Sequence, residues 1–222
     1  MTEQLPDDRP QRRREYSGPG STLGIAALIV IVVGVALWWF EFRETSGSGG
    51  QDAGGGRGVV ELPETLNPTG ESPAAREGRA APNFQLDTLA GDALTLTDLR
   101  GEYVLVNFWA SWCGPCRGET PDLQDFHIRT LGKEITVVGV NQQEDVDTAR
   151  TFVEEFAVDY PILFDFSGEV SAAYAVGVGG LPRTFLVNPD GVVERVYLGR
   201  ITDEQLREIE ETLPLARPRR RN

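Results

Sequence analysis

Residues that commonly bind metals are scarce in this chain. Its 222 residues include only two cysteines, one histidine and one methionine. A closed zinc site needs four ligands, and Cys113, Cys116 and His127 supply three at most. His127 also falls among charged residues in a stretch predicted to be a surface helix. We therefore predict no metal site and no other cofactor.

Basic residues are few in the C-terminal part of the chain. Residues 81–215 carry 23 Asp and Glu against 9 Lys and Arg, a net charge of −14. An acidic surface of this kind repels nucleic acid and anionic membrane surfaces. The composition therefore argues against a nucleic-acid partner, and a solvated acidic face is its simplest explanation.

The two cysteines lie close together in residues 112–117, Trp-Cys-Gly-Pro-Cys-Arg. A disulfide at this spacing closes a very small ring, which constrains little of the unfolded chain and therefore stabilises the fold little. A reversible two-electron switch explains the spacing better than a structural crosslink. The alternative is a cysteine pair that merely packs in the core.

An apolar run without any charge extends over residues 22–40. As a helix it would span roughly 28 Å, close to the thickness of a bilayer's hydrocarbon core. It ends in Trp38, Trp39 and Phe40, which are typical of a membrane interface. A cleaved signal peptide, the alternative, usually has a shorter apolar run and a cleavage site between small residues. We predict a single-pass transmembrane signal anchor over residues 21–41.

The segments around the predicted anchor differ in composition. Residues 1–20 contain four arginines, which predict a cytoplasmic N-terminal tail and an extracytoplasmic C-terminal domain at the cell membrane. Residues 42–80 are rich in glycine and proline and predict a flexible tether. Residues 81–215 are predicted to fold, and residues 216–222 to form a basic disordered tail.

Strands and helices alternate within residues 81–215. The stretches 84–86 and 94–96 flank a turn and predict a hairpin. Strands are further predicted at 103–109, 135–140, 161–164, 184–187 and 192–198, and helices from the cysteines to about 131 and at 146–156, 170–176 and 202–213. This order predicts an α/β domain with a mixed central sheet and helices on both faces.

The place of the cysteines in this order predicts their roles. Cys113 follows a buried strand and begins a helix, whose N-terminus offers partial positive charge and free N–H groups. Such surroundings lower the pKa of a thiol, and the thiolate is the reactive form in disulfide exchange. Pro115 suits the first helical turn, and Arg117 adds a nearby cation. We expect Cys113 to be the exposed attacking cysteine and Cys116 the deeper resolving one.

Two stretches resemble a known family. Residues 107–121, Asn-Phe-Trp-Ala-Ser-Trp-Cys-Gly-Pro-Cys-Arg-Gly-Glu-Thr-Pro, resemble the thioredoxin superfamily and in particular its membrane-anchored TlpA/ResA-like branch. Residues 180–185, Gly-Leu-Pro-Arg-Thr-Phe, resemble the cis-proline loop of that family. The resemblance covers about residues 81–213 and implies a thioredoxin-like fold.

The resemblance also implies residue roles. Pro182 is expected to be cis and to lie beside the dithiol, and the backbone of Leu181 is expected to pair with an extended substrate segment. Trp112 is expected to shield the dithiol. The remaining implied substrate contacts are Gly114, Pro115 and Gly180.

Glu119 is the expected proton acceptor. Thioredoxins usually have a buried aspartate where this chain has Asn107, and an amide cannot take a thiol proton at neutral pH. Glu119 follows Cys116 by three residues and so lies on an adjoining helix face, and the TlpA/ResA-like branch shares this exchange. Burial would raise the pKa of Glu119 and suit it as a general base for Cys116. The alternative is a solvated helix glutamate.

The resemblance implies a thiol–disulfide oxidoreductase. Its expected substrates are disulfides of exported proteins, such as apocytochrome c during cytochrome c maturation. The Gly-Pro pair between the cysteines resembles reducing thioredoxins, and a reductant outside the cytoplasm needs a membrane thiol-donor protein to supply electrons.

Three alternatives stay open. The first is a disulfide oxidase or isomerase. The second is a peroxiredoxin-type thiol peroxidase, although that pocket needs threonine three residues before the cysteine, where this chain has Ala110. The third is a copper-delivery protein that holds the ion on its dithiol, although no Met-rich or His-rich segment accompanies the cysteines.

Overall fold

The computed structural model describes residues 57–177 and 179–213. The predicted tail 1–20, the predicted anchor 21–41, the first part of the predicted tether and the predicted basic tail 216–222 lie outside the described residues. Among the helices of the described ranges, none is both long enough and apolar enough to cross a membrane.

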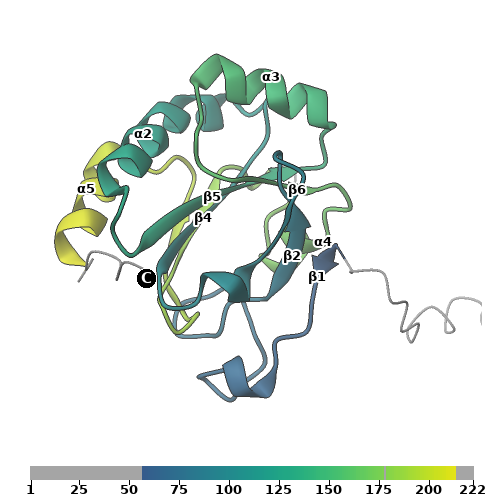
Figure 1. Cartoon of the computed structure of the whole chain (residues 1–222), viewed down its shortest axis with the longest axis vertical. Coiled ribbons are helices and arrows are strands. Elements are labelled where there is room, and N and C mark those ends of the chain that lie inside the picture. Colours follow the sequence, from purple (N-terminus) through teal and green to yellow (C-terminus); the bar gives the residue numbers. More distant parts are fainter. Residues whose placement is uncertain (1–56, 178, 214–222) are drawn as a thin grey trace, which may run out of the picture. The chain divides into compact units, whose positions relative to one another are not determined.

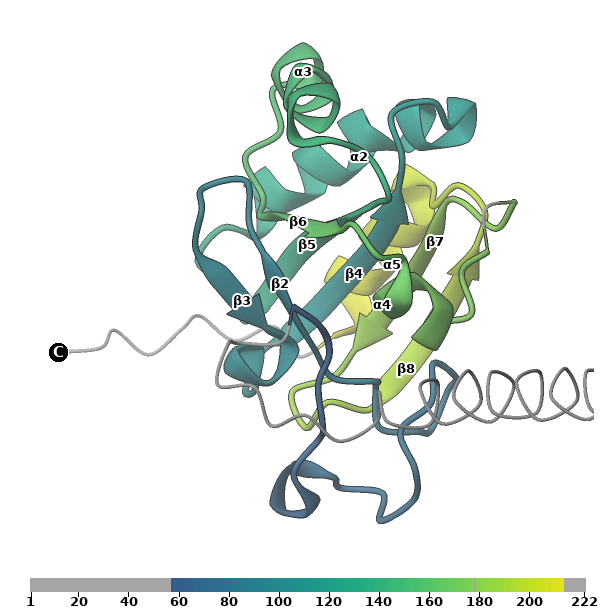
Figure 2. The ribbon, with the colours of Figure 1, turned by 90° about the vertical axis from the view of Figure 1, so that its right-hand side faces the viewer.

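The central sheet has five strands in the order β6-β5-β4-β7-β8 (Figure 2). β4, β5 and β6 run parallel, whereas β7 is antiparallel to both β4 and β8. The predicted mixed sheet is therefore confirmed. The strands are β4 Tyr103–Trp109, β5 Ile135–Gln142, β6 Ile162–Asp165, β7 Arg183–Val187 and β8 Val193–Leu198.

Helices cover both faces of this sheet (Figure 1). The helices are α2 Gly114–Thr130, α3 Val146–Phe156, α4 Glu169–Ala173 and α5 Asp203–Thr212. Residues of α2, α3 and α5 share one core with one face of the sheet, and residues of α4 and of the N-terminal hairpin share the other core. Both faces of the central strands are therefore buried, as their continuous apolar runs predict.

β4 shows how the sheet sorts its side chains. Leu105 and Trp109 belong to the core with α2, whereas Val106 and Phe108 belong to the core with α4. Successive strand residues point to opposite faces. Asn107 therefore shares the α2 face with Leu105 and Trp109, which brings a buried amide into an otherwise apolar layer.

Residues 57–80 differ from the prediction of a flexible tether over 42–80, because they pack against the domain. β1 (Gly58–Val59) pairs with β2 (Phe84–Asp87), and β2 pairs with β3 (Ala93–Thr95). The predicted hairpin thus gains a third strand and forms a separate sheet.

The end of this segment is also held by the domain. Ala80 forms an antiparallel bridge with Val192, and the amide of Gly78 donates to the carbonyl of Val193 at 2.9 Å. Glycine and proline content suggested a free chain, but backbone hydrogen bonds do not depend on side chains. The folded part therefore begins near residue 57 and not at residue 81.

Gly139 of β5 leaves no room for a side chain. A Cβ atom there would lie 2.8 Å from Cδ1 of Ile162 and 3.0 Å from Nε1 of Trp109. We expect Gly139→Ala to lower the free energy of unfolding by about 1–3 kcal/mol, as overpacking of a core does. Urea denaturation measures the change, and Gly114→Ala, whose Cβ meets nothing within 4 Å, is the control. An unchanged midpoint for Gly139→Ala would show that this layer is looser than its contacts indicate.

Candidate active site

Cys113 and Cys116 form a disulfide at the N-terminus of α2. Cys113 is the N-cap residue, and its sulfur accepts a hydrogen bond from the amide of Cys116 at 3.2 Å. Helix-terminal N–H groups of this kind favour a thiolate over a thiol. Cys113 is 5% exposed and Cys116 is fully buried. Cys113 is more enclosed than expected, whereas Cys116 is the deeper of the two residues, as expected.

The loop before β7 lies at the same end of the sheet as the dithiol. Arg183, the first residue of β7, pairs with Phe108, close to the end of β4 that leads into the cysteines. The Leu181–Pro182 bond is cis, as expected. Leu181 is partly buried and packs against the core cluster that contains both cysteines. The two stretches that resemble the thioredoxin family are therefore neighbours in space.

Backbone geometry explains the composition of this loop. The amide of Gly180 donates to the carbonyl of Gly177 at 2.8 Å, and a Cβ on Gly180 would lie 3.2 Å from that same oxygen. Among residues 57–177 and 179–213, none hydrogen-bonds to the backbone amide or carbonyl of Leu181. Within these described residues, the backbone amide and carbonyl of Leu181 therefore have no internal hydrogen-bond partner.

Trp112 is 59% exposed beside two buried cysteines, and its expected role in shielding the dithiol stays a prediction. Together with Ser111, Arg117 and Phe152 it lines a shallow groove of about 330 Å³ beside α3. The aromatic residues of this groove, Trp112 and Phe152, lie on the α3 side of the dithiol. The exposed ring of Trp112 can therefore contact a docked chain.

Arg117 contacts residues of α3. Its guanidinium forms an ion pair with Glu155 and lies over the rings of Phe152 and Phe156, 5.5 and 5.0 Å from their centroids. The carboxylate of Glu155 compensates part of this charge, so Arg117 supports a Cys113 thiolate less than an unpaired arginine would. The helix N-terminus remains the main support for the thiolate.

Glu144 is a site residue that the sequence did not reveal. Its carboxylate accepts hydrogen bonds from the amide and the hydroxyl of Ser111, at 2.8 and 2.5 Å, and from the side-chain amide of Asn141 at 2.7 Å. These bonds fix the turn that leads into Trp112 and Cys113. Glu144 follows β5 at the end where parallel strands deliver their loops to one edge, which is the one signal that could have identified it.

Glu119 is fully buried on α2. Its Oε1 accepts from the side-chain amide of Asn107 at 2.7 Å, and its Oε2 accepts from the backbone amide of Ile201 at 2.8 Å. Burial raises its pKa to about 7, although the hydrogen bonds from Ile201 and Asn107 and the charge of Arg200 oppose the rise. The expectation of a buried carboxyl with a raised pKa is confirmed, and the alternative of a solvated glutamate is wrong.

Asn107 connects Glu119 to the sheet. Its side-chain amide donates to Glu119 and also to the hydroxyl of Thr184 at 2.9 Å. Asn107 and Thr184 are paired residues of β4 and β7. The carboxyl group is thus held by the central strands on one side and by the turn between β8 and α5 on the other.

His127 takes no part in this site. It is partly buried and meets the ring of Tyr160 edge-on, at 5.9 Å between centroids. Burial lowers its pKa. Within residues 57–177 and 179–213, no three His, Cys, Asp or Glu side chains are placed to hold a metal ion.

Known proteins that are similar to this chain include thiol-disulfide oxidoreductases. Residues 78–196 match the AhpC/TSA family. The thiol-disulfide oxidoreductase ResA of Bacillus subtilis (strain 168) is 35% identical over 130 residues, which cover 59% of this chain and 72% of that protein. ResA of Geobacillus thermodenitrificans (strain NG80-2) is 35% identical over 143 residues, covering 64% of this chain and 81% of that protein.

Solved structures show the same similarity. StoA from Bacillus subtilis has a TM-score of 0.51 and 29% identity, covering 57% of this chain and 94% of that one. A thioredoxin-family thiol:disulfide interchange protein from Chlorobium tepidum TLS has a TM-score of 0.54 and 26% identity, covering 61% and 95%. With a family match over more than half of its length and a dithiol at a helix N-terminus, the chain belongs to the AhpC/TSA family of thioredoxin-like proteins and is a thiol–disulfide oxidoreductase related to ResA and DsbE.

Proposed function

We propose that this protein reduces disulfides of exported proteins, such as those of apocytochrome c during cytochrome c maturation. The observation that carries the proposal is the pairing of the Cys113–Cys116 disulfide with a buried carboxyl one helical turn away. A dithiol that works as a reductant must lose two protons and two electrons. A buried base beside the inner cysteine serves that direction, because it can take the proton of the thiol that resolves the mixed disulfide.

The reaction proceeds in two exchange steps. The thiolate of Cys113 attacks a sulfur of the target disulfide, which forms a mixed disulfide and releases one target thiolate. Glu119 then takes the proton of the Cys116 thiol, and the resulting thiolate attacks the sulfur of Cys113. The second target thiol leaves, and the protein is left with the Cys113–Cys116 disulfide.

The loop around Pro182 is proposed to present the target. The open backbone groups of Leu181 pair with an extended segment of the substrate, which aligns its disulfide with Cys113. Gly114, Pro115 and Gly180 supply a surface without bulky side chains, and they let the substrate backbone approach closely. Trp112 adds an apolar contact at the edge.

We further propose that residues 21–41 anchor the protein in the cell membrane, with the domain outside the cytoplasm. A membrane thiol-donor protein then returns electrons to the Cys113–Cys116 disulfide after each turnover. Support comes from the apolar run of residues 22–40 and the arginines that precede it.

The reduction potential tests the direction of the reaction. We expect a value closer to that of thioredoxin, about −270 mV, than to that of a strong oxidase, about −120 mV. Equilibration of the domain with glutathione buffers gives the potential, and the rate of insulin reduction gives the activity. A potential above about −150 mV would favour an oxidase or isomerase. Copper retention without insulin reduction would favour the copper-delivery alternative, and peroxide consumption the peroxidase.

A further inference from the structure

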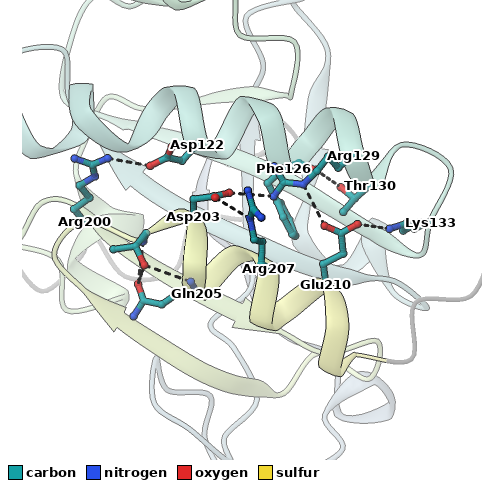
Figure 3. Close-up of polar contacts among 11 residues, drawn as sticks. Asp122, Phe126, Arg129, Thr130, Lys133, Arg200, Asp203, Gln205, Arg207 and Glu210 are labelled. Atoms are coloured by element: carbon teal, nitrogen blue, oxygen red, sulfur yellow. Dashed lines mark hydrogen bonds and ion pairs between the residues drawn. The ribbon is translucent and has the colours of Figure 1, made fainter.

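The turn between β8 and α5 crosses α2 directly beside Glu119. Ile201 in this turn is fully buried, and its amide donates to Oε2 of Glu119. The preceding residue, Arg200, extends along α2 and forms an ion pair with Asp122, at 2.9 Å between Nη2 and Oδ2 (Figure 3). The turn is thus attached to α2 through two consecutive residues. Arg200 contributes its side chain, and Ile201 contributes the backbone amide that donates to Glu119.

Gly118 makes the approach of Arg200 possible. A Cβ atom at this position would lie 3.1 Å from Nη1 of Arg200 and 3.5 Å from its Cζ. The guanidinium therefore lies close against bare helix backbone. Gly118 and Asp122 flank Glu119 on α2. Gly118 leaves room for the guanidinium of Arg200, and Asp122 forms the ion pair with it.

We propose that Arg200 is a positioning residue for Glu119: its ion pair with Asp122, made across Gly118, holds the Ile201 amide on the carboxylate. The inference rests on the proposed role of Glu119 as the base for Cys116. The amide donates to the ionised form of the carboxyl and so favours that form. Its loss would leave more of Glu119 protonated at neutral pH.

Other ion pairs between α2 and the α5 segment lie farther from Glu119. Arg129 pairs with Asp203 and Glu210, and Lys133 pairs with Glu210 (Figure 3). Arg129 is ten residues beyond Glu119 on the helix, which is roughly 15 Å along its axis. Arg129→Gln therefore removes ion pairs of the same kind with α5 and leaves the Arg200–Asp122 pair in place, so it is the matched control.

Within residues 57–177 and 179–213, four titratable or charged groups face Glu119. Arg200 and Asp122 lie at the surface, Tyr160 is buried before β6, and the Cys116 thiol appears one turn back on α2 when the disulfide is reduced. The charge of Arg200 lowers the pKa of Glu119 and that of Asp122 raises it. Burial and the charge of Glu119 raise the pKa of Tyr160, so Tyr160 stays neutral in the range of interest.

The opposite signs of the two charges provide the test. Arg200→Gln and Asp122→Asn each break the ion pair. If only charge mattered, Asp122→Asn would lower the pKa of Glu119, because a neighbouring negative charge is removed. If the ion pair positions the Ile201 amide, both variants raise the pKa of Glu119. The Glu119 carboxyl is followed by ¹³C NMR during a pH titration of the oxidised full chain.

We expect both variants to raise the titration midpoint by about one pH unit, whereas Arg129→Gln leaves it in place. At pH 7 the ionised fraction of Glu119 then falls from about a half to about a tenth, and resolution of the mixed disulfide slows about fivefold. The rate recovers at alkaline pH. Arg200→Lys, which can pair with Asp122, restores most of the rate at pH 7. Because the side chains of Arg200 and Asp122 are 50% and 27% exposed, loss of their ion pair costs little stability and the variants keep the fold.

Three outcomes would overturn the inference: a midpoint that falls in Asp122→Asn, a midpoint that does not move in Arg200→Gln, or an equal shift in Arg129→Gln. Adding Arg200→Gln to Glu119→Gln should not change the pH profile further, and a persisting effect would also count against it. A normal resolution rate in Glu119→Gln alone would instead refute the proposed role of Glu119. The NMR titration would still decide whether Arg200 positions its carboxyl.

Discussion

Replacing Cys113 with serine is expected to abolish disulfide reduction, with kcat/KM for insulin reduced by at least about a thousandfold. Cys113 is the N-cap of α2, and its sulfur accepts a hydrogen bond from the Cys116 amide. Cys113 also retains some exposure, whereas Cys116 does not. A serine hydroxyl at this place does not ionise at neutral pH and cannot form a disulfide. Stopped-flow or turbidity assays of insulin reduction measure the loss.

The same change at Cys116 should have a different result. Cys116→Ser keeps the attacking thiolate but removes the resolving one, so the reaction stops at the mixed disulfide. Mass spectrometry of the trapped adduct identifies the target, and the double variant lacking both cysteines is the control. If Cys113→Ser traps partners and Cys116→Ser does not, the assigned order of the two cysteines is reversed.

Replacing Glu119 with glutamine is expected to remove a fall in stability that this residue causes between pH 5 and pH 8. The pKa of Glu119 is about 7 in the folded protein against 4.5 for an ordinary glutamate. The folded state therefore binds this proton more tightly than the unfolded state does, and stability falls as the pH rises from 4.5 through 7. The loss is complete above pH 7 and amounts to about 3 kcal/mol.

Urea denaturation of the oxidised protein at several pH values measures this effect as the difference between the wild type and Glu119→Gln. Glu210→Gln is a control of opposite sign. Hydrogen bonding to Lys133 and Arg129 lowers the pKa of Glu210, so its contribution is present at neutral pH and is lost in acid. An equal pH dependence of stability in the wild type and in Glu119→Gln between pH 5 and pH 8 would contradict the raised pKa of Glu119.

Glu119→Gln should also slow the resolving step, on the order of a hundredfold at pH 7, as removal of a general base does. The effect should shrink at alkaline pH, where the Cys116 thiol ionises without a base. Attack by Cys113 should change little, because its thiolate is supported by the helix N-terminus. Single-turnover kinetics with a dye-labelled disulfide peptide separate these two steps, and equal slowing of both would argue for a structural defect.

Local patterns in the chain predicted most of the core architecture. The run at 103–109 became β4 because its residues are apolar in succession, and the spacing of the cysteines placed them at a helix start. The prediction of a flexible tether was wrong for residues 57–80. Their glycine and proline content gave no indication of the backbone hydrogen bonds that this segment makes with β2 and with residues 192 and 193. Backbone hydrogen bonds do not depend on side chains, so composition does not predict them.

The surroundings of the dithiol were less predictable. Ser111 and Glu144 are 33 residues apart, and Glu119 and Ile201 are 82 apart. Neither pair follows from a repeat or a motif, because the contacts depend on how loops meet at one end of the sheet. The ion pair of Arg117 could not be predicted for the same reason, since its partner Glu155 belongs to another helix.

The sequence by itself determined the dithiol, the order of strands and helices, and Glu119 as the carboxyl nearest to Cys116 along the helix. These features depend on spacing within a single element, where geometry follows from the chain alone. Only the tertiary structure decided that Glu119 is buried and which groups donate to it. Its pKa depends on desolvation and on Asn107, Ile201 and Arg200, which come from a strand and a turn that folding alone brings to α2.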